Sequence, residues 1–425
     1  MREVRIRDTL SGEVRPLEPR GGEAGIYACG PTVYGRIHIG NARPYVVFML
    51  LRRFLAREGW RARLVVNVTD VNDKIYDAAR QAGRPSAEWA REMTEAYFED
   101  TGRLGLGRPD AEPLATETIE GIVSLISDLI EAGHAYESAG DVYFRVRSFE
   151  GYGKLSNRST DDMDQGEEAG AAELKESPLD FALWKARKEG EDTAWPSPWG
   201  EGRPGWHIEC SAMAEAELGT DFAIHGGGSD LVFPHHENEI AQTEAARGVP
   251  LAEVWMHNGM VQIAEEKMSK SAGNIFQLST AIDTFGAAAV VGFLVSGHYR
   301  QPITFSAAAL EEAGRRNERI REFFRSTARA EGEGGEEDPA VNEHLEAFMA
   351  ALCDDFNTPR AFAALFELIA EANRRPVAGA REAVAGMLPL LGLEALLETG
   401  AGPDEEAERL LAEREAARRE RDFAR

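Results

Sequence analysis

The fold of this chain is decided by the stretch Ala28-Cys29-Gly30-Pro31-Thr32-Val33-Tyr34-Gly35-Arg36-Ile37-His38-Ile39-Gly40-Asn41. Its first residues end an apolar segment, 25–29, that predicts a short buried strand, and the glycines and proline that follow predict a turn. From Asn41 onward, apolar residues recur at helical spacing. A helix that begins here presents free backbone N–H groups and partial positive charge, which suit a phosphate group. A capped strand-to-helix turn without a ligand explains the same pattern, so the stretch alone leaves both interpretations open.

A second apolar run, 64–69, follows this helix. Strand, helix and strand in succession predict two parallel strands joined by a right-handed crossover, and therefore an α/β fold with a Rossmann-like parallel sheet. Residues 116–205 interrupt the pattern with a mixed, Trp- and Pro-rich block that we interpret as an insertion. From residue 340 onward, Ala, Leu, Glu and Arg recur at helical spacing, which predicts an all-α helical bundle.

The composition is that of a globular protein, with 425 residues of which 43% are hydrophobic and 28% charged. No apolar run approaches the roughly 20 residues that span a bilayer, and the N-terminus lacks the apolar core of a signal peptide. We therefore predict a cytoplasmic protein that does not enter a membrane. The three cysteines are far apart and odd in number, which argues against a disulfide framework.

The net charge of −26 argues against binding of polyanions over the whole surface. Local basic patches can still bind RNA, and one helical segment carries several arginines. The alternative is a solvated helix face on which these arginines pair with neighbouring glutamates. The residues concerned are Arg315, Arg316, Arg319, Arg321 and Arg325, with Glu311, Glu312, Glu318 and Glu322.

The histidines are unevenly distributed, because five of the nine lie in the segment 207–257. Pro234 within it can open a helix, which would place His235 and Glu239 four residues apart on one helix face. His236 and Glu239, three residues apart, form a competing pair. One imidazole and one carboxylate on a shared face are half of a metal site.

Two cysteines can complete such a site. Cys29 ends the first predicted strand, at the edge of the sheet where ligands bind, and Cys210 lies within the histidine-rich segment. Two thiolates, an imidazole and a carboxylate suit Zn²⁺. Cysteines so far apart are a weaker metal signal than paired Cys-x-x-Cys motifs, so spacing alone leaves open a buried apolar role for Cys210. Cys353 is expected to pack within the helical bundle.

Two short signatures, 38–41 (His-Ile-Gly-Asn) and 267–271 (Lys-Met-Ser-Lys-Ser), resemble in order and separation the paired signatures of class I aminoacyl-tRNA synthetases. Other segments narrow the resemblance to the family of cysteinyl-tRNA synthetases of bacterial type. These segments are 27–34, 180–185, 205–211, 225–231, 233–239 and 298–300. The resemblance covers nearly the whole chain.

This resemblance implies a cysteine–tRNA ligase, which uses ATP to activate L-cysteine as cysteinyl adenylate and then transfers it to tRNA(Cys). It also implies one Zn²⁺ per chain, which binds the substrate thiolate, and Mg²⁺ with ATP. Packing alone separates serine from cysteine poorly, whereas a soft metal–sulfur bond separates them well. The attacking carboxylate is already a nucleophile, so the reaction needs positioning and charge stabilisation rather than a general base. We expect a monomer.

The resemblance assigns site residues in four groups. The catalytic group is His38, Asn41, Lys267 and Lys270; the ATP-binding group is Gly40, Asp230 and Lys270; the group that binds the amino acid is Gly30, Thr32, Thr69, Trp206 and His225; and the zinc ligands are Cys29, Cys210, His235 and Glu239.

The predicted domain organisation follows from the pattern of helices and strands together with the resemblance to cysteinyl-tRNA synthetases. Residues 1–115 and 206–278 are the two halves of the catalytic domain, 116–205 is the inserted connective block, 279–330 is a helical stem-contact region, 331–339 is a linker and 340–425 is a helical tRNA-binding bundle. The family continues past this bundle into a small anticodon-recognising module, which we expect here to be truncated or absent.

Two alternative functions remain to be separated. The cysteine ligase of mycothiol biosynthesis joins cysteine to glucosaminyl-inositol, but its signature has a second histidine in place of Asn41 and a glutamine in place of His225. A non-catalytic zinc-bearing paralogue would not need His38 or the two lysines of the second signature. These positions favour the tRNA ligase.

Overall fold

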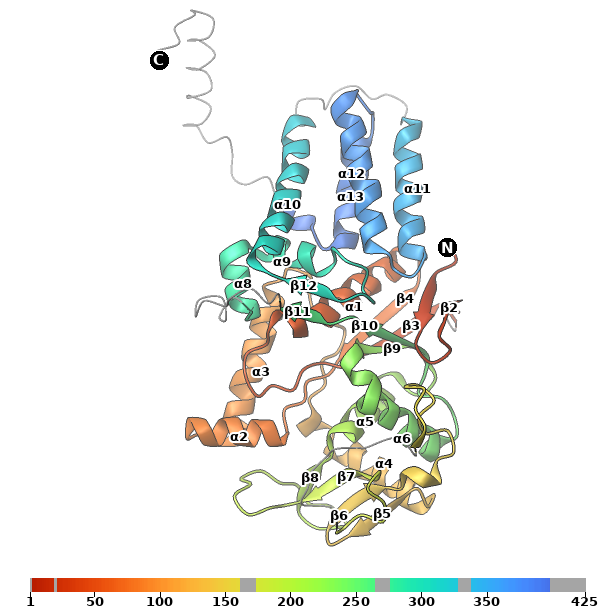
Figure 1. Ribbon diagram of the computed structural model, residues 1–425, viewed down its shortest axis with the longest axis vertical. Coiled ribbons are helices and arrows are strands. Elements are labelled where there is room, and N and C mark those ends of the chain that lie inside the picture. Colours follow the sequence, from red (N-terminus) through yellow and green to blue (C-terminus); the bar gives the residue numbers. More distant parts are fainter. Residues whose placement is uncertain (1, 19–20, 161–172, 264–275, 328–337, 398–425) are drawn as a thin grey trace, which may run out of the picture.

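The computed structural model of the chain describes residues 2–18, 21–160, 173–263, 276–327 and 338–397. A four-stranded sheet lies at its centre, in the strand order β10-β9-β3-β4, and every neighbouring pair is parallel (Figure 1). Its strands are β3 (Glu23–Ala28), β4 (Arg61–Val66), β9 (Phe222–Gly228) and β10 (Ala252–Asn258). The predicted α/β fold with a parallel sheet is confirmed.

Helix α1 (Ile39–Arg57) connects β3 to β4 and lies against the sheet. The sequence predicts one apolar face, but residues 46–51 are buried all round the helix. The reason is that α1 contacts the strands on one side and the helices α8 (Leu278–Phe285) and α9 (Ala287–Leu294) on another. A helix enclosed in this way is apolar over its whole surface rather than along a stripe.

A second sheet lies within the segment that interrupts the α/β pattern (Figure 1, lower part). It is antiparallel, in the order β5-β6-β7-β8, and with helix α4 (Ile119–Glu131) it encloses a separate hydrophobic core. Its strands are β5 (Ala135–Ser138), β6 (Asp141–Phe144), β7 (Phe181–Ala186) and β8 (Gly202–Pro204). Helices α5 (Trp206–Leu218) and α6 (Glu237–Arg247) pack against this core through Ile208, Ala212 and Ala241.

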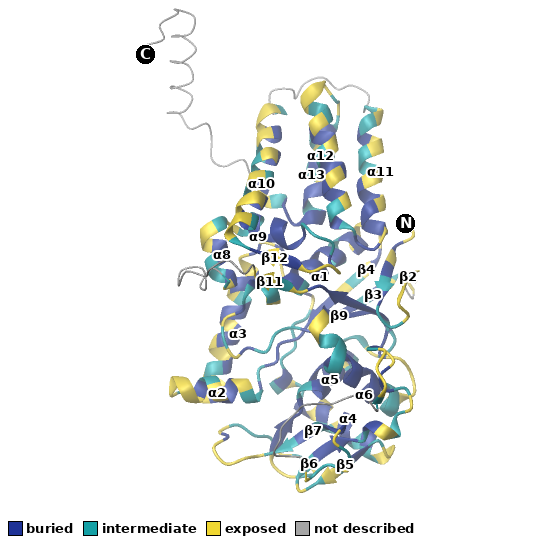
Figure 2. Cartoon of the chain, in the orientation of Figure 1, coloured by how far each residue is buried: buried dark blue, intermediate teal, exposed yellow. Residues whose placement is uncertain are grey.

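The C-terminal helices form a bundle at the end of the molecule opposite to the second sheet (Figure 1). Its helices are α10 (Ala307–Thr327), α11 (Pro339–Cys353), α12 (Thr358–Arg374) and α13 (Ala380–Met387). Figure 2 shows the buried residues of these helices turned toward one another and the exposed ones turned outward. Cys353 is buried in this core, as predicted. The predicted linker and the basic C-terminal end lie largely outside the described residues.

The remaining elements surround the sheet. They are the hairpin β1 (Arg5–Asp8) and β2 (Glu13–Pro16), helices α2 (Asp73–Ala82) and α3 (Ser86–Gly102), and the parallel pair β11 (Val261–Ile263) and β12 (Ile303–Phe305). Within the described ranges, no helix is long and apolar enough to cross a membrane.

The arginine-rich face of α10 is largely paired. Arg315 lies 2.7 Å from Glu312, and Glu318 lies 2.6 Å from Arg325 and 3.4 Å from Arg321. Such contacts favour the solvated, ion-paired helix face over an RNA-binding patch.

Arg43 of α1 joins this helix to the segments that lead into β11 and β12. The guanidinium is 1% exposed and donates to the backbone oxygens of Gly259, His298 (3.1 Å) and Gln301 (2.7 Å). Burial lowers its pKa to about 10, so it remains charged at neutral pH.

Replacing Arg43 with methionine is expected to lower the free energy of unfolding by about 3 kcal/mol, because three carbonyls lose a charged donor. Arg52→Met is the matched control on the same helix, since Arg52 pairs with Asp110 at the surface and its loss should change stability by about 1 kcal/mol or less. Urea unfolding of both variants provides the measurement. An equal decrease in the free energy of unfolding for the two variants would contradict the stabilising role of the Arg43 hydrogen bonds.

Candidate active site and metal centre

A pocket of about 340 Å³ opens at the carboxyl ends of β3 and β9, the edge at which ligands bind in open α/β sheets. It is lined by the loop after β3 and by the first residues of α1, α5 and the turn after β9. The predicted site residues that line it are Cys29, Gly30, Thr32, His38, Gly40, Asn41, Trp206 and Asp230. A side chain at Gly30 would place its Cβ 1.7 Å from the backbone oxygen of Asn67, so only glycine lets this loop approach the end of β4.

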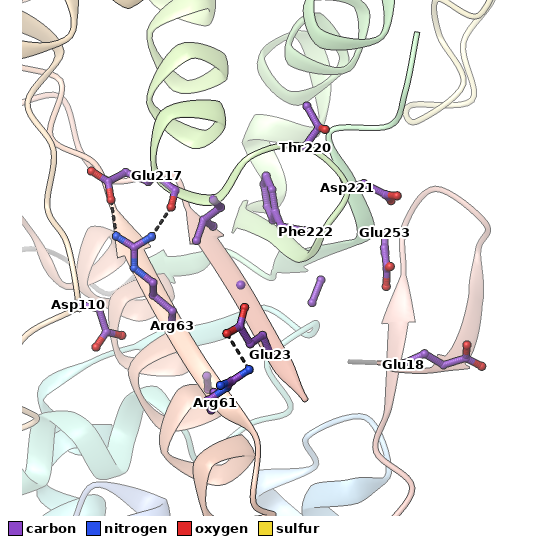
Figure 3. Close-up of a pocket in the computed structure, with 14 residues that line it drawn as sticks. Glu18, Glu23, Arg61, Arg63, Asp110, Glu217, Thr220, Asp221, Phe222 and Glu253 are labelled. Carbon is purple, nitrogen blue, oxygen red and sulfur yellow. Dashed lines mark hydrogen bonds and ion pairs between the residues drawn. The ribbon is translucent and has the colours of Figure 1, made fainter. Parts of the chain in front are cut away.

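A larger cavity, of about 560 Å³, lies at the opposite edge of the sheet (Figure 3). Its two arginines are already paired, Arg61 with Glu23 at 2.8 Å and Arg63 with Glu217. None of the described residues that line it is a cysteine or a histidine. We therefore assign the chemistry to the smaller pocket.

His38 and Asn41 form the N-terminal cap of α1. The His38 backbone is extended, its Nδ1 accepts a hydrogen bond from the Asn41 backbone N–H at 3.3 Å, and Asn41 Oδ1 accepts one from the His38 N–H at 3.2 Å. Burial lowers the pKa of His38, and a neutral ring that accepts at Nδ1 carries its proton on Nε2. The ring also stacks on Phe276, with centroids 4.5 Å apart. The cap thus leaves Nε2–H as a donor at a helix N-terminus.

Four side chains converge beside the pocket as the resemblance implies: Cys29, Cys210, His235 and Glu239. Their ligand atoms, two sulfurs, one nitrogen and one carboxylate oxygen, all lie within 4.8 Å of one another, and all four residues are buried. Glu239 Oε1 is 3.2 Å from His235 Nε2 and 3.6 Å from Cys29 Sγ. We call these four residues the first quartet.

Helical backbone begins at Pro234, as predicted. Within the helical segment Val232–His236 only Phe233 departs from helical geometry, with φ −140° and ψ 132°, and α6 follows this segment at Glu237. His235 therefore precedes α6 by two residues and still reaches Glu239.

A second quartet overlaps the first and consists of Cys29, His225, His236 and Glu239, whose ligand atoms also lie within 4.8 Å of one another. His225 Nε2 is 2.7 Å from Glu239 Oε2, and His236 Nε2 is 3.3 Å from Cys29 Sγ. The competing pair, His236 and Glu239, is thus present as well, with Nε2 and Oε1 3.9 Å apart.

Two further histidines support the rings of the quartets. His207 Nδ1 lies 2.9 Å from His235 Nδ1, and His257 Nε2 lies 2.8 Å from His236 Nδ1. Each contact occupies the ring nitrogen that faces away from the quartets and leaves Nε2 directed at them. Second-layer contacts of this kind orient histidine ligands in metal sites.

The electrostatics of the cluster favour a cation. Burial raises the pKa of the Cys29 thiol, and burial lowers the pKa values of His235 and His236 well below their usual range. The imidazoles are therefore neutral and able to coordinate, while the buried thiol ionises only when a positive charge is supplied. Two sulfurs, one nitrogen and one oxygen form a donor set that fits Zn²⁺.

The other predicted residues have different places. Thr69 and His225 are buried, at 1% and 0% exposure, behind the pocket wall rather than on its surface. His225 contacts Glu239 and stacks on Trp255 at 4.4 Å. Lys267 and Lys270 lie outside the described residues.

The sequence interpretation missed several polar residues around the pocket. Glu209 and Asn67 are buried beside Thr69, and His207 and His257 support the quartets. The uneven distribution of histidines was the available signal for His207 and His257. A different signal was available for Glu209. A glutamate that lies next to Cys210 on a buried helix needs a hydrogen-bonding partner.

Comparison with known proteins finds related sequences over nearly the whole chain. Residues 15–315 match the family of tRNA synthetases class I (C) catalytic domains, and residues 347–392 match the DALR domain. The cysteine–tRNA ligases of Chromohalobacter salexigens and Brevibacillus brevis are each 45% identical to this chain, over 99% of it and 94% of their own length.

Solved structures show the same fold. Mycobacterium tuberculosis methionyl-tRNA synthetase in complex with methionyl-adenylate has a TM-score of 0.64 at 16% identity, over 88% of this chain and 89% of that one. The leucyl enzyme of Agrobacterium radiobacter K84, in its ternary complex with tRNA, also has a TM-score of 0.64, at 12% identity over 90% of this chain and 85% of that one. With the matches at the sequence level, these findings show that the chain belongs to the class I cysteine–tRNA ligase family.

Proposed function

We propose that this ligase binds L-cysteine and ATP in the pocket at the carboxyl edge of the sheet and selects cysteine through zinc held by the first quartet. The observation that carries the proposal is the convergence of two sulfurs, a nitrogen and a carboxylate oxygen within 4.8 Å, beside the pocket lined by His38 and Trp206. The first quartet is preferred to the second because it offers two thiolates, which suit the soft side of zinc chemistry.

Zinc bound there would supply a soft Lewis acid that takes a thiolate and not a hydroxyl. The chain's own residues hold the amino acid in place around it. Trp206 lines the pocket one turn before Cys210, with its ring 4.4 Å from that of His235. Gly30 and Thr32 form the adjacent wall of the pocket.

In the activation step, the cysteine carboxylate attacks the α-phosphorus of ATP and diphosphate leaves. The N-terminus of α1 beyond Gly40 and the His38 Nε2–H are placed to donate to phosphate oxygens. Asp230, at the pocket edge, suits the ribose hydroxyls. Lys267 and Lys270 add positive charge as negative charge develops on the phosphates, and Mg²⁺ accompanies the nucleotide.

The second step transfers the cysteinyl group to the terminal adenosine of tRNA(Cys). The helices α11–α13 of the bundle are the proposed contact for the body of the tRNA, consistent with the match of residues 347–392 to the DALR domain. A cytoplasmic location is part of this proposal.

An acceptor assay tests the proposed function. The full chain is supplied with labelled cysteine, ATP and either a tRNA(Cys) transcript or glucosaminyl-inositol. We expect label to transfer to the tRNA and not to the aminosugar. Transfer to the aminosugar, or adenylate formation without transfer to either, would contradict the proposal.

Lys270→Ala is expected to slow cysteine-dependent ATP–diphosphate exchange by about a hundredfold, because a charge contact to the transition state is lost. The affinity for cysteine should hardly change, since this loop serves the ATP side. Lys188→Ala, a change on the inserted block, is the control and should leave exchange unaltered. An exchange rate near that of the parent chain for Lys270→Ala would show that this lysine has no such role.

A further inference from the structure

The buried carboxylate Glu209 has no place in the mechanism described so far. It lies on the first turns of α5, next to Cys210, and is 1% exposed. Its Oε2 accepts a hydrogen bond from the Thr69 hydroxyl at 3.1 Å, while its Oε1, also buried, has no hydrogen-bond partner among the described residues. A buried carboxylate oxygen without a donor is costly unless a ligand supplies one.

Thr69 connects Glu209 to the pocket wall. Its backbone N–H donates to Pro31 O, its carbonyl accepts from the Val33 N–H, and the two segments form a parallel bridge at Thr32. Pro31 and Thr32 line the pocket. The position of the Thr69 hydroxyl is therefore fixed relative to the wall against which the amino acid lies.

The direction of the Thr69 hydrogen bond determines what this hydroxyl can recognise. A hydroxyl has one proton, and Thr69 donates it to Glu209, so its oxygen faces any further partner as an acceptor. Among the residues that the structure describes, the one other donor to it is Asn67 Nδ2, at the long distance of 3.5 Å. Asn67 is itself held by the Gly30 N–H, which donates to Asn67 Oδ1 at 2.9 Å. The Thr69 oxygen can therefore accept a hydrogen bond from a donor group of a ligand.

The substrate carries such a donor close to its sulfur. In cysteine the α-nitrogen is three bonds from the sulfur, which places the two atoms about 3–4 Å apart in staggered rotamers. Glu209 adjoins Cys210 of the first quartet on α5, and Thr69 bridges to Thr32 in the pocket wall, so both residues lie near the place at which the thiol is taken to be held.

We propose that Glu209 is a positioning residue for recognition of the α-ammonium group of the substrate. By accepting the Thr69 proton it presents Thr69 Oγ1 as an acceptor to the ammonium group. This inference rests on the proposed function, because it takes the thiol to be held at the first quartet.

Two fragments of cysteine separate recognition of the ammonium group from recognition of the thiol and the carboxylate. Cysteamine keeps the thiol and the ammonium group, whereas 3-mercaptopropionate keeps the thiol and the carboxylate. Each is measured as a competitor of cysteine in ATP–diphosphate exchange by the zinc-loaded full chain. For Glu209→Gln we expect weaker cysteamine inhibition and a higher KM for cysteine, by about tenfold to a hundredfold, as for loss of one charge-assisted hydrogen bond. Inhibition by 3-mercaptopropionate, the KM for ATP and the zinc content should stay unchanged.

Further variants test whether weaker cysteamine binding results from a general disturbance of the structure. Glu215→Gln is the matched control, because Glu215 lies on the same helix and also accepts from a threonine hydroxyl, that of Thr243 at 2.8 Å. It should bind both fragments like the parent chain. Thr69→Val should reproduce the selective loss of cysteamine, and Thr69→Ser should restore binding.

The outcomes are distinguishable from failure of the proposed function. Equal weakening of both fragments in Glu209→Gln, or unchanged cysteamine binding, would overturn the inference. If 3-mercaptopropionate inhibited the parent chain equally with and without zinc, the metal proposal itself would fail.

Discussion

Cys210→Ala is expected to purify with almost no zinc and to lose most of its preference for cysteine over serine. The first quartet loses one of its two thiolates, and thiolates are the donors that zinc holds most firmly among these ligands. Without the metal–sulfur bond, discrimination should fall to the range of ~10–200-fold that ordinary pocket contacts provide. Elemental analysis gives the zinc content, and ATP–diphosphate exchange with each amino acid gives kcat/KM.

This variant also separates the two quartets, because Cys210 belongs only to the first. Zinc retained in Cys210→Ala but lost in His236→Ala would assign the metal to the second quartet. Cys353→Ala is the matched control, since Cys353 is a buried cysteine of the helical bundle. It should keep its zinc and its selectivity.

His38→Ala is expected to slow cysteinyl adenylate formation by about 10²–10³-fold, the usual cost of removing one donor to a charge that develops in the transition state. The donor concerned is Nε2, because Nδ1 accepts a hydrogen bond from the Asn41 N–H. Single-turnover formation of the adenylate is the appropriate measurement.

A second substitution separates catalysis from capping. His38→Ser keeps a side chain that can cap α1, so its stability should stay near that of the parent chain. Its hydroxyl cannot reach as far as the imidazole Nε2, so the adenylate should still form slowly. Recovery of the full rate in His38→Ser would mean that His38 acts only as a helix cap.

The parallel sheet could be predicted because two short apolar runs, 25–29 and 64–69, lie on either side of a helical pattern and overlap β3 and β4. The start of α1 was equally accessible, since the Gly/Pro turn precedes it. The burial of α1 on all sides could not be predicted from the sequence. Burial on a second side depends on α8 and α9, which follow more than 200 residues later, and no local pattern reports such a contact.

The metal site was accessible in part. Spacing suggested His235 with Glu239 and left His236 as a rival, and the resemblance added Cys29 and Cys210. The structure shows why spacing could not decide, because adjacent histidines both reach the same carboxylate. The contacts of His207 and His257 join residues 28 and 21 positions apart, so they depend on how α5, α6 and β10 meet.

The central claim is that a zinc ion held by the first quartet binds the substrate thiolate. Zinc-edge X-ray absorption on the full chain tests this claim most directly. The quartet predicts two sulfur neighbours per zinc without substrate, three with cysteine and two with serine. One sulfur neighbour without substrate, as the second quartet would give, or a count that cysteine leaves unchanged, would contradict it.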